Sequence, residues 1–313
     1  MALLSRFPLI PFLVAAYLGY SGTRKKSLSP SGGLAAFVVG FSMMAVPLRT
    51  FGVSLIVFYL AGSRATKVGK ARKAALEEGH QEAGYRGAAQ VLCNSLSALV
   101  ASLVWSAAFV PGSFASALLS GFIPQNSPYD FNTWCPIAPP ASSKLSRTLL
   151  LVTLGHFACC LGDTLASELG ILSPSQPRLV TTWKPVPPGT NGGMSPTGTL
   201  ASLMGGVIMG ATLSATLLVE SAACRTQWHS VVLPLLAYGA LGGVFGSFID
   251  SLMGATIQQT RYSTSTKRVL TDESGEPVAG TELKVISGVD VLTNNQVNLL
   301  SSILTSLFIG YLA

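Results

Sequence analysis

The sequence contains little charge. Lys, Arg, Asp and Glu make up 11% of the 313 residues, whereas about 25% is usual in a soluble domain. Hydrophobic residues make up 49%, and the mean hydropathy is +0.51. This composition excludes a disordered chain and argues against a soluble enzyme, and there is no fixed-period repeat of a collagen or a coiled coil. It predicts a polytopic membrane protein.

The sequence also lacks the cysteine and charge patterns of other protein classes. Its cysteines form no CxxC pair, and four of them lie in or beside apolar runs, so we expect small apolar fillers and no disulfide framework. The net charge of +7 comes without finger spacing or a basic patch interleaved with aromatic residues, which excludes a nucleic-acid partner. The cysteines are Cys93, Cys135, Cys159, Cys160 and Cys224.

Apolar runs long enough to enter a bilayer recur along the chain, and a full crossing takes about 20 mostly apolar residues. Runs 197–219 and 231–249 carry no charge and are clear spans. Runs 32–47 and 51–62 are short, and they form either a tight helix pair or one broken crossing. The complete set is 7–22, 32–47, 51–62, 92–123, 149–162, 197–219, 231–249 and 297–313.

Run 92–123 is too long for one straight span, and it contains Pro111 and Gly112. We interpret it as one crossing followed by a re-entrant or interfacial piece. The predicted fold class is therefore all-α: a polytopic helical bundle with about eight crossings, in a range of six to nine. It forms a single membrane domain over residues 1–313.

Positive charge gathers in alternate gaps between the runs. With eight crossings, one side of the membrane receives 15 of the 20 Lys and Arg residues and the other side receives 5. The positive-inside rule makes the first side cytoplasmic, with polar loops near 63–91, 170–196 and 256–296. We expect a multi-pass protein of an endomembrane such as the endoplasmic reticulum. The loops of the basic side are 23–31, 63–91, 170–196 and 250–296.

Glycines recur at the spacing that lets membrane helices approach closely. Small residues four apart allow backbone-to-backbone packing. The pairs are Gly206 with Gly210, Gly239 with Gly243, and Gly242 with Gly246.

Three acidic residues, Asp163, Glu168 and Asp250, lie at the ends of apolar runs. A charge at the centre of a membrane costs about 2.5–3.5 kcal/mol on insertion scales, so such residues indicate function. Asp163 and Glu168 are separated by about 140° on a helix and share a site only if the helix breaks between them. Asp250, Gly254 and Gln258 are four apart and share one face. The competing interpretation is that these acids are solvated at helix ends.

A glycine-rich segment precedes the helix that starts near Thr197. Glycines allow backbone N–H groups to turn inward as an anion nest, and the N-terminus of a helix favours anions. Lys184 lies just before the segment and can add positive charge. The alternative is an ordinary turn-rich connector. The predicted phosphate-binding residues of the segment are Gly189, Thr190, Asn191, Gly192 and Gly193.

The loop after the third run is basic. Lys67 and Lys70 are candidates for a phosphate clamp, although such clusters also set topology or contact anionic lipid. Gln90 and Asn94 are four apart at the start of the next span and face one way.

Several of these motifs resemble the membrane family that contains transmembrane protein 19 and the plant phytyl-phosphate kinase. Leu165 departs from the Trp expected in many members, and loop 123–147 has no clear family motif. A weaker likeness extends to dolichol and phytol kinases and to integral-membrane cytidylyltransferases. The motifs are Gly162-Asp163-Thr164, Ala166-Ser167-Glu168-Leu169-Gly170, Pro187-Pro188-Gly189-Thr190-Asn191-Gly192-Gly193, Asp250-Ser251 with Gly254-Ala255 and Gln258, and Asn294-Asn295-Gln296-Val297-Asn298.

The resemblance implies a kinase that converts an isoprenoid alcohol monophosphate to its diphosphate. The phosphoryl donor is a nucleoside triphosphate, with CTP favoured, and Mg²⁺ is the cofactor. Asp163, Glu168 and Asp250 are then the catalytic residues, and Asp163 and Asp250 hold the metal, because Mg²⁺ prefers carboxylate oxygen. Gln90, Asn94, Ser251 and Gln258 are supporting polar residues.

Two other functions fit the same residues. Acids at membrane depth also occur in transporters of a phosphorylated lipid or ion, although no inverted internal symmetry is visible in this sequence. A membrane scaffold without chemistry is the third interpretation, and it predicts that neutralising Asp163 changes nothing.

Overall fold

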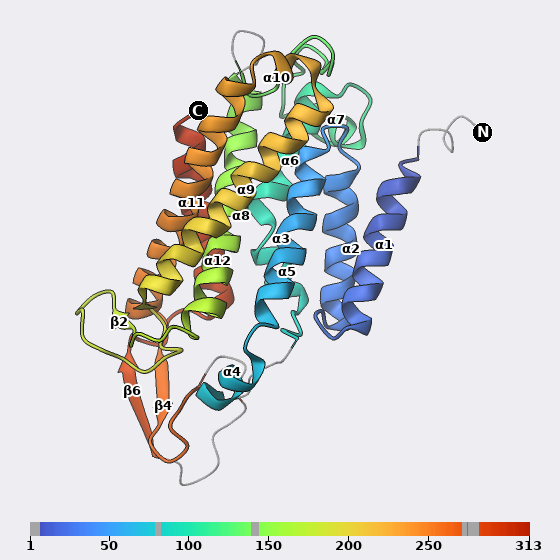
Figure 1. Cartoon of the computed structure of the whole chain (residues 1–313). Coiled ribbons are helices and arrows are strands. Elements are labelled where there is room, and N and C mark those ends of the chain that lie inside the picture. Colours follow the sequence, from blue (N-terminus) through green and yellow to red (C-terminus); the bar gives the residue numbers. More distant parts are fainter. Residues whose placement is uncertain (1–6, 79–82, 139–143, 271–273, 275–281) are drawn as a thin grey trace.

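The protein is a bundle of helices with a small polar layer at one end (Figure 1). The structure is a computed structural model, and it describes residues 7–78, 83–138, 144–270, 274 and 282–313. The helices are α1 (Leu9–Arg24), α2 (Pro30–Met44), α3 (Thr50–Thr66), α4 (Lys70–Leu76), α5 (Ala88–Cys93), α6 (Leu96–Phe109), α7 (Phe114–Leu119), α8 (Lys144–Gly170), α9 (Pro196–Glu220), α10 (Ala222–Thr226), α11 (Trp228–Thr256) and α12 (Asn294–Tyr311).

Three of the described helices, α8, α9 and α11, are long and apolar enough to cross a membrane, with 27, 25 and 29 residues. The two short apolar runs form separate helices, α2 and α3. Run 92–123 bends between α5 and α6, continues to Phe109 and then forms the short helix α7. This agrees with one main helical segment followed by a shorter separate segment. The total of about eight crossings stays a prediction.

Helices α8, α9 and α11 pack backbone against backbone. A Cβ atom added at Gly206 of α9 would lie 2.0 Å from the carbonyl oxygen of Gly239 of α11. A Cβ at Gly162 of α8 would lie 2.9 Å from Cα of Gly243, and one at Gly243 would lie 2.5 Å from the carbonyl oxygen of Ser202. The packing predicted from the glycine spacing is confirmed, and we call this contact the glycine seam.

The four basic loops meet at the lower end of Figure 1. Leu28 forms a β-bridge with Arg86, which joins loops 23–31 and 63–91. The Arg72 guanidinium donates to the carbonyl oxygen of Leu172 at 3.2 Å, and the backbone N–H of Asn191 donates to Thr260 Oγ1 at 3.1 Å. The loops therefore lie on one face of the bundle, as the charge pattern predicts. Residues 79–82, 271–273 and 275–281 of these predicted loops lie outside the described residues.

This end also carries short strands, which corrects the all-α prediction to a mostly helical fold. Four strands form a sheet in the order β1-β5-β4-β6, and two others pair antiparallel as β2-β3. The strands β4 and β5 form a local hairpin, whereas β1 joins from a distant segment, with Glu77 opposite Val269. Each strand is only 2 to 5 residues long, too short to show a clear alternating pattern in the sequence. The strands are β1 (Glu77–Glu78), β2 (Arg178–Leu179), β3 (Gly193–Met194), β4 (Thr260–Ser263), β5 (Arg268–Leu270) and β6 (Leu283–Ser287).

The opposite end is closed by a disulfide between Cys135 and Cys224, with an S–S distance of 2.00 Å. The expectation that the cysteines are small apolar fillers is wrong for these two, because two cysteines 89 residues apart reveal no pairing through their spacing. Trp105 packs edge-on against Tyr129 near this end, with ring centroids 5.2 Å apart. Disulfides persist in oxidising compartments, so this end agrees with the non-cytoplasmic side assigned by loop charge.

The placement of the loops predicts the outcome of cysteine labelling in sealed vesicles. In a Cys93→Ser background, Ala75→Cys and Lys184→Cys should react with an impermeant thiol reagent from one side, because both exposed positions lie in the basic loops. Ser120→Cys, exposed at the end of α7, should react from the other side. Labelling of positions 75 and 184 from opposite sides would contradict the fold.

Candidate functional site

A cavity of about 960 Å³ lies between the helices and the basic loops. Most of the residues predicted for the site line it, and they come from α5, α8, α11 and the glycine-rich segment. The three predicted lysines do not line it. The predicted residues that line the cavity are Asp163, Glu168, Asp250, Gly189, Thr190, Asn191, Gly192, Gly193, Gln90, Asn94, Ser251 and Gln258.

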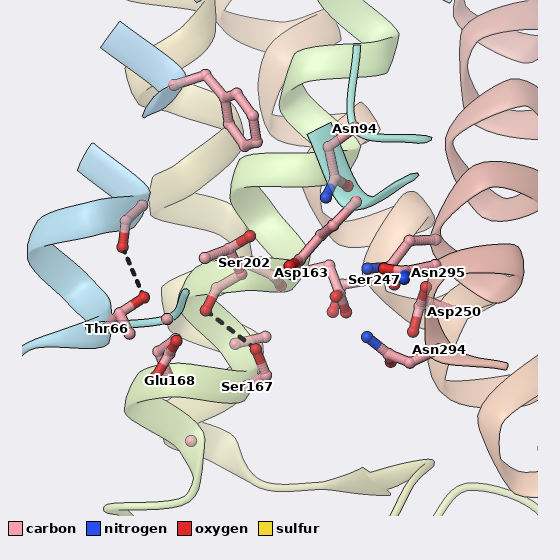
Figure 2. Close-up of a pocket in the computed structure, with 18 of the residues that line it drawn as sticks. Thr66, Asn94, Asp163, Ser167, Glu168, Ser202, Ser247, Asp250, Asn294 and Asn295 are labelled. Atoms are coloured by element: carbon pink, nitrogen blue, oxygen red, sulfur yellow. Dashed lines mark hydrogen bonds between the residues drawn. The ribbon is translucent and has the colours of Figure 1, made fainter. Parts of the chain in front are cut away.

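The acids of α8 and α11 are brought together on one wall. Ser301 Oγ of α12 donates a hydrogen bond to Asp250 Oδ2 at 2.9 Å, and Ser247 lines the cavity together with Asp163. The two carboxylates lie within electrostatic reach of each other, and Figure 2 shows them with Ser247 and Asn295 around the same space. The glycine seam beside Gly162 sets this arrangement, because it fixes α8 directly against α11.

Glu168 belongs to a different wall of the cavity. Helix α8 is continuous from Lys144 to Gly170, so the expected helix break between Asp163 and Glu168 is absent, and the two side chains point in different directions. Glu168 Oε2 accepts from Nζ of Lys73 at 2.5 Å. In Figure 2 Glu168 lies beside Thr66, away from Asp250. The predicted trio of acids is therefore a carboxylate pair plus one separate ion-paired acid.

Lys73 lines the cavity, although the sequence gives no sign that it does. It is 1% exposed, and its Nζ also donates to the carbonyl oxygens of Ala65 at 3.2 Å and Thr66 at 3.1 Å. One lysine among several in a basic loop gives no signal of burial, because the burial comes from α4 folding back under α3. A buried ammonium with a carboxylate partner is the arrangement that makes a buried charge tolerable.

The cations at the cavity differ from the predicted ones. Lys67 and Lys184 are exposed and Lys70 is half-buried, and none of them lines the cavity. Lys73 and Arg86 line it instead. Arg86 donates to Ser63 Oγ at 3.2 Å and to Thr66 Oγ1 at 3.0 Å.

The glycine-rich segment reaches the cavity, but part of its backbone is already engaged. The N–H groups of Thr190, Asn191 and Gly193 donate to oxygens of the protein. Gly192 has φ +76°, and a Cβ there would lie 2.5 Å from the carbonyl oxygen of Ser251. Glycine is thus required at position 192 by its backbone conformation and its contact with α11. Since three backbone N–H groups of the segment already have partners, fewer are free to bind an anion than the sequence predicts.

At the start of the following helix, α9, at least one backbone N–H group already has a hydrogen-bond partner within the protein. Ser195 caps α9, and its Oγ accepts from the N–H of Gly198 at 3.1 Å. Other N–H groups of the first turn can still favour an anion through the helix dipole. The anion site predicted at this terminus stays a prediction.

Asparagine side chains line the cavity, and Figure 2 shows Asn294 and Asn295 beside Asp250. Asn94 lies at the bend between α5 and α6, and Asn294, Asn295 and Asn298 open α12. Oδ1 of Asn298 is buried and has no hydrogen-bond partner among the described residues. Amide groups both donate and accept, so this cluster adds neutral binding groups to a site whose charges come from the acids, Lys73 and Arg86.

The donor set of the cavity fits Mg²⁺. No group of three or more His, Cys, Asp or Glu side chains in the described part of the chain could hold a metal. Mg²⁺ does not need such a cage, because it is usually bound through one or two carboxylates, retained waters and substrate phosphates. Asp163 and Asp250 are such a pair. Assignment of the metal to these residues stays a prediction.

Away from the acids the cavity has apolar walls. On α11 the lining face changes along the helix from Leu241, Val244 and Phe245 to Asp250 and Ser251. The polar half lies toward the basic loops, and the apolar half lies deeper in the bundle. The cavity is therefore amphipathic along its length.

Comparison with known proteins identifies relatives along nearly the whole chain. The model of "Integral membrane protein DUF92" matches residues 13–306. "Protein PGR" of Arabidopsis thaliana is 37% identical over 94% of this chain and 92% of its own length. "Uncharacterized membrane protein MJ0933" of Methanocaldococcus jannaschii is 25% identical over 80% of this chain and 83% of its own. "Protein VTE6, chloroplastic" of Arabidopsis thaliana is 26% identical over 74% of this chain and 56% of its own. No solved structure matches the chain.

The buried ion pair predicts a coupled effect on stability. Lys73→Met should lower the free energy of unfolding by about 3 kcal/mol, because breaking a buried pair leaves an uncompensated charge. The double variant Lys73→Met, Glu168→Gln should recover part of that loss. Thermal unfolding in detergent measures both, and Lys284→Met, at an exposed lysine, is the control. Losses that simply add in the double variant would show that the two side chains do not interact.

Proposed function

The chain belongs to the DUF92 family of integral membrane proteins, and from this premise we propose that it is an integral-membrane kinase of an isoprenoid alcohol monophosphate. It transfers a phosphoryl group from a nucleoside triphosphate, with CTP the favoured donor, and forms the diphosphate. The observation that carries the proposal is an amphipathic cavity that joins Asp163, Asp250 and Lys73 to apolar walls.

The cavity suits a substrate with a phosphate head and a hydrocarbon tail. Its polar part opens toward the basic loops, where a soluble nucleotide arrives from the cytoplasm. Its apolar part lies at membrane depth, where a prenyl tail remains out of water. Lys73 and Arg86 supply positive charge near the phosphates, and the asparagines supply neutral donors.

The reaction needs alignment and charge neutralisation more than acid–base chemistry. An oxygen of the acceptor monophosphate forms a bond to the γ-phosphorus of the nucleotide. The bond from that phosphorus to the β–γ bridging oxygen breaks, and the nucleoside diphosphate leaves. The acceptor oxygen is already charged, so no strong general base is required, and catalysis comes from positioning and electrostatic stabilisation.

Asp163 and Asp250 would hold Mg²⁺ in this site, and the bound ion supplies neutralisation of the phosphate charge. The residues of the chain do the rest. Ser301 orients the Asp250 carboxylate, and the glycine seam prevents the two carboxylates from moving apart. Glu168 holds Lys73 at the cavity wall and keeps its ammonium oriented.

Transport of a phosphorylated lipid is the competing function. Acids at membrane depth support it, whereas the kinase is supported by the position of the cavity's polar residues, which lie toward the basic loops where a nucleotide arrives. A non-catalytic scaffold leaves the enclosed carboxylate pair without a use. Concerning location, a relative named as chloroplastic gives no support to the endoplasmic reticulum, and we propose only an organellar or endomembrane bilayer with the basic loops facing the cytoplasm or its equivalent.

The carboxylate pair predicts the effect of neutral substitutions on activity. Asp163→Asn and Asp250→Asn keep side-chain size and remove a metal ligand, so each should lower the rate about 100-fold or more. The measurement is transfer of labelled phosphate from CTP, ATP, GTP or UTP to a prenyl monophosphate by purified protein with Mg²⁺. Membrane insertion should be unaffected, because losing a buried acid favours insertion.

Asp290→Asn is the matched control, because Asp290 is an exposed acid of the same loop end that does not line the cavity. It should retain full activity. Full activity in Asp163→Asn or Asp250→Asn would remove that residue from the mechanism. Wild-type protein that forms no diphosphate with any of the four nucleotides would contradict the kinase proposal.

A further inference from the structure

The apolar part of the cavity is a channel between two groups of helices. One wall comes from α1, α2 and α3, and the other comes from α11. On α2 the lining residues Ala36, Val39, Gly40 and Met44 follow helical spacing and share one face. Gly40 is about 15 Å along the helix from its start at Pro30, so the channel extends well beyond the polar residues.

Gly40 differs from the glycines that close helix contacts. A Cβ added at Gly33, on the same helix, would lie 2.4 Å from Cγ2 of Thr23, which leaves no room for a side chain. A Cβ at Gly40 would lie 3.5 Å from Cε of Met44 and 3.7 Å from Cβ of Ala15, which are ordinary contacts. A methyl group therefore fits at position 40 in contact with Met44 and Ala15, and a larger side chain would have to extend into the channel that Gly40 lines.

The direction of the channel shows what can occupy it. The lining of α11 is apolar at Leu241, Val244 and Phe245, and it becomes polar at Asp250, about 14 Å away from Leu241 by helical rise. A single linear amphiphile with a charged head fits this sequence of surfaces. A compact apolar ligand would leave the polar half empty, and a free phosphate would leave the apolar half empty.

We propose that this channel holds the hydrocarbon tail of the acceptor and that Gly40 sets the length of tail that the protein accepts. The inference rests on the proposed function for the identity of the head group. Gly40 is then a specificity-determining residue. A larger side chain at this position, one turn before the last lining residue of α2, Met44, would narrow the far part of the channel, so a long tail would lose its last contacts while a short tail would keep all of its own.

The test measures binding of prenyl monophosphates to the purified full-length protein in lipid nanodiscs. The probes are geranyl, farnesyl, geranylgeranyl and phytyl monophosphate, and the readout is ligand-dependent thermal stabilisation, which follows affinity by mass action. Gly40→Leu should weaken binding of the longest tails about tenfold or more, because each methylene excluded from an apolar site loses its transfer free energy. Binding of geranyl monophosphate should not change.

Two further variants keep the test decisive. Gly40→Ala adds only the Cβ that the structure accommodates, so it should fold and shift the length preference in the same direction by a smaller amount. Val38→Phe adds similar bulk on the exposed side of the same helix, where Val38 is 52% exposed, and it should bind like the wild type.

The outcomes separate this inference from the kinase proposal. One result is a protein that binds long tails, with a preference that Gly40→Leu shifts to shorter tails, but that transfers no phosphate from any nucleotide. That result supports the channel and refutes the kinase proposal. Unchanged length preference in both Gly40 variants, or equal loss in Val38→Phe, overturns the assignment of Gly40. Wild-type protein that binds none of the four monophosphates overturns the channel itself.

Discussion

The glycine seam between α8, α9 and α11 is the contact on which the rest of the structure depends. Apolar helices gain little from each other in a bilayer, because lipid is as apolar as their side chains, and close backbone approach is what holds them together. Gly162 of α8 meets Gly243 of α11 in that contact. Since Asp163 follows Gly162 and Asp250 lies two turns beyond Gly243, the seam that holds the bundle also brings the carboxylates to one cavity.

The two ends of the bundle differ in composition. Basic loops, short strands and the Lys73–Glu168 pair gather at one end, where polar backbone and buried charge find partners. The Cys135–Cys224 disulfide and packed aromatic rings close the other end. A cavity that is polar toward the basic loops and apolar deeper in the bundle follows from this asymmetry, and it is the arrangement that the proposed kinase requires.

Local signals predicted part of this arrangement, and tertiary contacts decided the rest. Glycine spacing, acids beside apolar runs and loop charge are visible in short windows, so the seam, Asp163, Asp250 and the shared loop face could be predicted. The burial of Lys73 depends on a partner 95 residues away, and the disulfide depends on one 89 residues away. The uninterrupted course of α8, which separates Glu168 from Asp163, depends on packing along its whole length.

Nucleotide binding by the purified wild-type protein tests the central claim most directly. The protein in detergent is titrated with CTP, ATP, GTP and UTP, with Mg²⁺ and again with EDTA, and binding is followed by equilibrium dialysis. The account predicts saturable binding of at least one nucleotide that depends on Mg²⁺ and weakens as salt screens the charges of the site. Absence of binding for all four nucleotides with Mg²⁺ present would contradict phosphoryl transfer and favour transport.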